Sequence, residues 1–219
     1  MAAATGRLNT PHPPTTKGAR LVLELILIVA NVGTAVVPYA IFKRHSQGLA
    51  PGYVAARLVE AIFIAIGILS LLTFLFMRQE GTAGTDTALG DVFVAIYDRA
   101  FLLGPDIFAG VANGMILGYL MYRSGLVPRS LAVLGLIGGP LLATCAIAIM
   151  FDVTERGSVL QGLATIPEFI WELSFGIYVI VKGFKPSPIL AELDNEAAAR
   201  AAGARPPASS MVSAANRPA

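Results

Sequence analysis

A set of polar side chains stands inside long apolar stretches of this chain, and these are the residues that could do chemistry. They are Glu24, Asn31, Arg57, Glu60, Asp106, Asn113, Glu168, Trp171 and Glu172. A charged side chain at the centre of a membrane span costs about 2.5–3.5 kcal/mol on insertion scales, so it normally faces other helices and has a partner there. We therefore expect these groups to face the interior of a helix bundle. Carboxylates in that position could bind a proton, a small cation or a basic small molecule.

The spacing of four of these residues predicts two local arrangements. Arg57 and Glu60 are three residues apart, so in a helix they share a face and can form an ion pair. Glu168 and Glu172 are four residues apart and are expected to point to the same side. Two like charges at that spacing are unfavourable unless another group neutralises them.

Position along the apolar stretches predicts an acidic vestibule that leads to the Arg57–Glu60 pair. The carboxyls expected in the outer half of the membrane are Glu24, Asp106, Glu168 and Glu172. The alternative interpretation is structural. In that case Arg57 neutralises one of these glutamates, Asn31 pairs with Asn113, and the polar set fixes the register of the helices, because structural ion pairs perturb titrating groups as readily as functional ones.

Several other chemistries have little support in the sequence. His12 and His45 are far from any second histidine at ligand spacing, so no metal site is predicted. Cys145, the single cysteine, lies among Ala, Ile and Leu and is interpreted as packing rather than as a nucleophile. No cofactor motif is present, and the formal net charge of +2 gives no indication of a nucleic-acid partner.

The stretches that carry these residues are each long enough to cross a membrane as a helix. They cover residues 21–42, about 54–77, about 101–121, 131–151 and about 159–181. About 20 apolar residues suffice to cross roughly 30 Å of hydrocarbon. The composition agrees, with 55% hydrophobic and 14% charged residues and a mean hydropathy of +0.69. We predict an all-α, polytopic transmembrane helix bundle of five spans, whose main partner is the lipid bilayer.

The ends of the chain differ from this central part. Residues 1–20 are expected to form a disordered polar tail, residues 21–184 the membrane domain, and residues 185–219 a flexible tail. The basic residues next to the spans fall on one side, and they are Lys43, Arg44, Arg123, Arg129, Lys182 and Lys185. Because lysine and arginine resist translocation, this side is expected to be cytoplasmic, with the C-terminus in the cytoplasm and the N-terminus outside.

Small residues predict how the third and fourth spans pack. Gly110, Gly114 and Gly118 recur every four residues, and Gly135 and Gly139 have the same spacing. Glycine lets helix backbones approach closely in a membrane. The two spans are joined by a short loop and are expected to form an antiparallel pair. If the glycine face of the third span pointed outward instead, it would be a docking surface for a partner helix.

Several short motifs occur in order along the chain. Among them are Ala30–Ala35 (ANVGTA), Gly52–Glu60 (GYVAARLVE), Leu117–Ser124 (LGYLMYRS), Leu134–Pro140 (LGLIGGP) and Pro167–Leu173 (PEFIWEL). In these motifs the chain resembles the bacterial multi-pass membrane proteins grouped as domain of unknown function 4386, over roughly residues 21–188. The resemblance implies a helical membrane fold and a location in the bacterial plasma membrane, but no activity. Family members typically have six spans, with one more apolar helix at the front, where this sequence has a polar tail.

Two functions remain open at the level of sequence. The first is a small transport, permeation or ligand-binding module whose site is the polar core of the bundle. The second is a non-catalytic partner or scaffold subunit of a membrane complex, suggested by the glycine face. An intramembrane enzyme would need a nucleophile or a metal constellation that the sequence does not display.

Overall fold

The computed structural model describes residues 14–81 and 87–201, and residues 1–13, 82–86 and 202–219 are outside this part. Every element within the described residues is a helix. In chain order they are α1 (Pro14–Val36), α2 (Tyr39–His45), α3 (Leu49–Gln79), α4 (Thr87–Phe101), η1 (Leu102–Phe108), η2 (Gly110–Leu117), α5 (Gly118–Ser124), α6 (Arg129–Met150), α7 (Val159–Lys182) and α8 (Pro188–Ala201). The membrane domain predicted from residue 21 therefore starts in a helix that already begins at Pro14.

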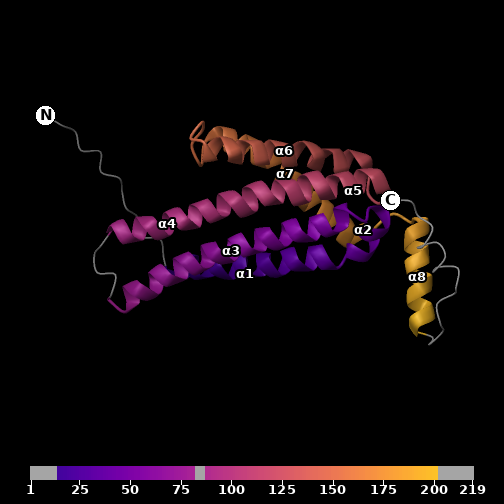
Figure 1. The fold of residues 1–219 in the computed structure, drawn as a ribbon, viewed down its shortest axis with the longest axis horizontal. Helices are drawn as coiled ribbons and strands as arrows, with labels where there is room; N and C mark the ends of the chain where they lie inside the picture. The colour runs from indigo at the N-terminus through magenta and orange to yellow at the C-terminus, as the bar shows by residue number, and fades with distance from the viewer. Residues whose placement is uncertain (1–13, 82–86, 202–219) are drawn as a thin grey trace.

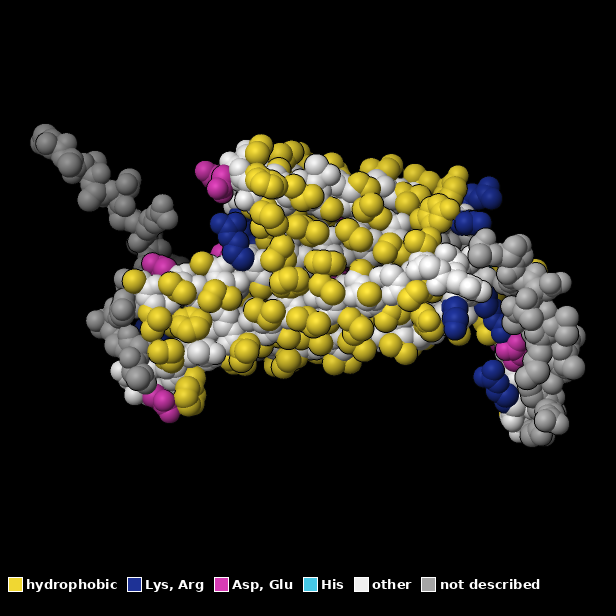
Figure 2. Space-filling view, viewed as in Figure 1, with side chains coloured by type: hydrophobic (Ala, Val, Ile, Leu, Met, Phe, Trp, Pro, Cys, Tyr) yellow, Lys and Arg dark blue, Asp and Glu magenta, His cyan; other side chains and the backbone are white. Residues whose placement is uncertain are grey.

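The long helices run side by side along one axis (Figure 1). By length and composition, four helices of the described residues can cross a membrane, and α1 with α2 makes a fifth if this pair, bent by 43°, is one span. Figure 2 shows that hydrophobic side chains cover the flank of the bundle, while lysine and arginine gather mainly at the end near α2 and α8. The predicted all-α membrane bundle is confirmed, and its basic side chains cluster at one end as expected.

The third span is longer than the sequence predicted. It is one helix from Ala88 to Ser124, 37 residues, or about 55 Å at 1.5 Å per residue. The sequence prediction began at residue 101 because Asp91, Asp98 and Arg99 lower the hydropathy of the preceding segment. In Figure 1 the α3 and α4 ends extend past the end of α6.

The middle of this span is π-helical. The segments η1 and η2 are π-helices, and Pro105 lies inside η1. The π-helix is rare, occurs mostly as single-turn bulges inside α-helices, and is frequently found at functional sites. Two of the predicted site residues, Asp106 and Asn113, lie in these segments.

Glycines bring the third span against α6. A Cβ added to Gly114 would lie 2.2 Å from the Gly139 Cα, and one added to Gly110 would lie 2.7 Å from the Gly139 carbonyl oxygen. The backbones therefore touch, as the sequence predicted. Because α6 covers this glycine face, the feature that suggested a scaffold function is not on the surface.

The α7 helix lies against α6 through two more glycines. A Cβ on Gly135 would be 2.6 Å from the Trp171 ring, and one on Gly138 would be 2.6 Å from the Glu168 nitrogen. The Ser158 hydroxyl accepts a hydrogen bond from the Gln161 nitrogen and caps the start of the helix. These contacts set which side of α7 faces the bundle.

The α8 helix differs from the flexible tail predicted for residues 185–219. Its acidic face binds Arg44 of α2, with Arg44 nitrogens 3.0 Å from Glu192 Oε2 and 2.7 Å from Glu196 Oε2. Figure 1 shows α8 running across the axis of the bundle at this end. The sequence could not reveal this pairing, because its partners are 148 and 152 residues apart.

The docking of α8 is expected to depend on pH. The hydrogen bond from Arg44 lowers the pKa of the Glu196 carboxyl below its usual 4.5. A carboxyl with a lowered pKa stabilises the folded arrangement above its usual pKa, and that contribution is lost as the pH falls through the lowered value. We therefore expect α8 to be docked at pH 7 and to be released only in acid below 4.5.

Hydrogen exchange of residues 188–201 measures this release. At pH 7, E196Q should raise the exchange rate, while D194N is the control on the same helix, since Asp194 forms no ion pair within the described residues. Equal protection of α8 in E196Q and in the unchanged protein would contradict the expectation.

Candidate functional site

The inner polar cluster is built around Arg57 of α3. Arg57 Nη1 lies 2.7 Å from Glu60 Oε2, and both side chains are buried. Arg57 Nη2 donates to Asn31 Oδ1 at 2.6 Å and to Thr34 Oγ1 at 3.2 Å. Asn31 Nδ2 in turn donates to Glu60 Oε1 at 2.9 Å. The predicted Arg57–Glu60 pair is confirmed, and α1 supplies the groups that complete it.

A second polar cluster joins α3, η2 and α7. Tyr53 donates to Asn113 Oδ1 at 3.4 Å, and Asn113 Nδ2 donates to Glu172 Oε1. The indole of Trp171 donates to the Asn113 carbonyl oxygen at 3.0 Å, and this side chain has no exposed surface. The Asn31–Asn113 pair of the alternative, structural interpretation is wrong, because Asn31 binds Glu60 and Asn113 binds Glu172 instead.

Glu168 is the least satisfied carboxyl of the site. It is 2% exposed, and within the described residues neither of its carboxyl oxygens has a hydrogen-bond partner. It packs against two glycines, since a Cβ added to Gly114 or Gly138 would lie 2.8 or 2.9 Å from Glu168 Oε2. An ionised carboxylate without a donor in a low-dielectric interior is strongly unfavourable.

The exposed position of Glu172 contradicts the expectation that all the ionisable groups face the interior of the bundle. Its side chain is exposed on the flank of α7, although one oxygen binds Asn113. The buried stripe of α7 contains Ala164, Glu168 and Trp171, at spacings of four and three residues. Because Trp171 fills the space beside Gly135, the adjacent position 172 is turned away from α6. Glu168 and Glu172 are therefore one turn apart but in different environments.

The outer carboxyls bind different neighbours. Tyr97 donates to Glu24 Oε1, which joins α1 to α4, and Gln161 donates to Asp106 Oδ2 at 3.2 Å, which joins α7 to η1. The predicted vestibule does not coincide with either of two surface pockets within the described residues, because neither is lined by Glu24 or Asp106.

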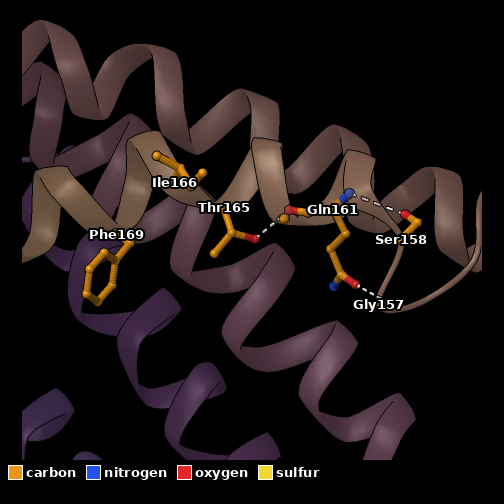
Figure 3. Close-up of a pocket in the computed structure, with 7 residues that line it drawn as sticks. Gly157, Ser158, Gln161, Thr165, Ile166 and Phe169 are labelled. Carbon is orange, nitrogen blue, oxygen red and sulfur yellow. Dashed lines mark hydrogen bonds between the residues drawn. The ribbon is translucent and has the colours of Figure 1, made fainter.

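One of these pockets lies at the beginning of α7 (Figure 3). It has a volume of about 370 Å³ and is lined by Ser158, Gln161, Thr165 and Phe169, among others. The Gln161 side chain accepts from the Gly157 nitrogen at 2.7 Å, and its amide nitrogen reaches Asp106. Gln161 therefore lines this pocket and also binds Asp106 of the third span.

Sequence reasoning missed Thr34, Tyr53, Tyr97 and Gln161 as partners of the site. Thr34 is three residues after Asn31 and Tyr53 is four residues before Arg57, so helical spacing was a usable signal for these two. Tyr97 and Gln161 bind residues on other helices, and their roles follow only from the packing. Within the described residues there is no group of three or more His, Cys, Asp or Glu that could hold a metal ion.

The fold and the site define a membrane-spanning helical bundle with a polar core. Comparison with known proteins identifies the family of this bundle. The chain belongs to the family described as Domain of unknown function (DUF4386), whose model matches residues 3–183. This confirms the family resemblance inferred from the sequence motifs.

One partial similarity to a curated protein also exists. Disulfide bond formation protein B of Ralstonia nicotianae is 32% identical over 88 residues, which cover 39% of this chain and 55% of that protein. The chain therefore spans about half the length of the curated relative it matches. No solved structure matches the chain.

Proposed function

We propose that this protein binds and relays protons inside the membrane, as a small permeation or transport module centred on Glu168. The observation that carries the proposal is the buried carboxyl of Glu168, which has no hydrogen-bond donor within the described residues. Carboxylates inside membrane helices commonly serve as proton relays, because a proton removes the cost of the buried charge.

Close packing favours a proton over a larger cation at Glu168. The carboxyl is packed against Gly114 and Gly138. A calcium ion needs six to eight oxygen ligands and a magnesium ion near-octahedral coordination. The described residues offer no cluster of ligands of that kind. A proton needs only one carboxyl oxygen and fits this space.

In this proposal, protons reach the buried carboxyl of Glu168 through Glu172. It lies one turn farther along α7, and its exposed carboxyl is held by Asn113. Asn113 also contacts Tyr53, so hydroxyl, amide and carboxyl groups form a continuous chain between α3 and α7. In this proposal the α2 end of the bundle faces the cytoplasm, because lysine and arginine gather mainly at that end.

The disulfide chemistry named for the partial relative is not part of the proposal. The 219 residues contain one cysteine, Cys145. It is buried in an apolar cluster with Ala146 and Ile149. A dithiol–disulfide relay within one chain needs two cysteines.

Proton flux into proteoliposomes tests the proposed function. Vesicles with a trapped pH-sensitive dye and a valinomycin-set potassium potential should change internal pH faster with the protein than without it. E168Q and E172Q should reduce the rate to that of empty vesicles, because a side-chain amide cannot take up and release a proton as a carboxyl does.

E155Q is the matched control, since Glu155 is an exposed glutamate in the α6–α7 connection. It should keep the full flux. A rate with the unchanged protein equal to that of empty vesicles, or full flux in E168Q, would contradict the proposal.

A further inference from the structure

A second surface pocket lies on the flank of the bundle, where α3 meets α4 and η1. Phe63 and Ile66 of α3 form one wall, and Val92, Ile96 and Leu103 contribute to the other. Its volume is about 400 Å³, and Arg99 is the one charged residue that lines it. This groove is separate from the polar core.

Arg99 has no carboxylate partner within the part of the chain that the structure describes. Its side chain is exposed, and within residues 14–81 and 87–201 it forms no ion pair. The adjacent Asp98 instead faces Arg156, whose Nε is 3.9 Å from Asp98 Oδ1. An exposed guanidinium without a protein partner, beside an apolar groove, is free to bind an anion from outside the protein.

The position of Arg99 along the bundle matches the level of lipid headgroups. Arg156, in the connection between α6 and α7, donates to the Asp98 carbonyl oxygen. Arg99 is therefore at the level where the fourth span ends and the fifth span begins. The groove continues deeper, because Phe63 lies beside Gly104, five residues or about 7.5 Å farther along the helix.

We infer that this groove binds one anionic phospholipid, with its phosphate on Arg99 and an acyl chain against Phe63, Ile66 and Leu103. A guanidinium can bind a phosphate through two parallel hydrogen bonds. Basic groups between membrane helices are a known means of selecting anionic headgroups. The unmatched charge of Arg99 is the reason that an anionic lipid is selected over a zwitterionic one.

Lipid binding to the purified full-length chain in detergent tests the inference by native mass spectrometry. Phosphatidylglycerol and phosphatidylcholine with the same acyl chains are the probes. The unchanged protein should prefer phosphatidylglycerol by about fivefold, the ratio that corresponds to roughly 1 kcal/mol per basic residue. R99Q should remove the preference without lowering the melting temperature of the lipid-free protein, because Arg99 has no ion pair to lose. A95F, which fills the groove lined by Ala95, should weaken the binding of both lipids.

R78Q is the control for the loss of one arginine, since Arg78 lies over the Phe74 ring and outside the groove. It should keep the preference. The inference is overturned if R99Q still prefers phosphatidylglycerol, if R78Q loses the preference equally, or if A95F binds both lipids as well as the unchanged protein. If millimolar inorganic phosphate displaces the bound lipid as well as phosphatidylglycerol does, the site binds free phosphate, and the inference of a lipid ligand is wrong. The inference is independent of proton flux through Glu168.

Discussion

Replacing Arg57 by methionine is expected to lower the free energy of unfolding by about 3–5 kcal/mol, because it leaves the buried Glu60 charge without its partner. Glu60 is 3% exposed, and its carboxyl is otherwise bound only by the Asn31 amide within the described residues. This is the largest effect expected of a single change in the polar core.

The measurement is equilibrium unfolding of the purified protein in mixed micelles, with the double variant R57M/E60M as the decisive comparison. The double variant should recover most of the lost stability, because it removes both charges and replaces them with apolar groups. R156M is the control, since its pair with Asp98 is partly exposed to solvent and 3.9 Å long and should contribute at most about 1 kcal/mol. A double variant as unstable as R57M would show that the pair is not the source of the loss.

Gly114→Ala is expected to destabilise the bundle by about 3 kcal/mol, at the upper end of the usual cost of overpacking. The added Cβ would lie 2.2 Å from the Gly139 Cα and 2.8 Å from Glu168 Oε2. Since two backbones meet there, no flexible side chain can move aside, and the third span must shift away from α6.

Gly176→Ala is the control for this prediction, because a Cβ at Gly176 meets nothing within 4 Å. Alanine is the better helix former by up to about 1 kcal/mol, so this variant should be neutral or slightly stabilising in the same unfolding measurement. Equal stability of G114A and G176A would contradict the close packing of the third span on α6.

Local spacing explains the parts of the site that could be predicted from the sequence. The Arg57–Glu60 pair lies within one helix, where a separation of three residues fixes the geometry. A four-residue glycine repeat in the third and fourth spans, together with the short loop between them, was enough to predict their antiparallel contact.

Contacts between distant helices explain the parts that could not be predicted. Asn31 could pair with any donor or acceptor at its level, and the choice of Glu60 over Asn113 depends on how α1 sits against α3. The exposure of Glu172 depends on the rotation of α7, which the fit of Trp171 against Gly135 determines. A helical wheel places Glu168 and Glu172 on one side, but it does not say where the boundary of the buried stripe falls.

The protonation of Glu168 is the most direct test of the account, and infrared spectroscopy of the protein in lipid at neutral pH can measure it. A carbonyl stretching band of a protonated carboxyl should be present in the unchanged protein and in E155Q, and it should be lost in E168Q. If the band is missing, or if it persists unchanged in E168Q, the buried carboxyl does not hold the proton, and the central claim is wrong.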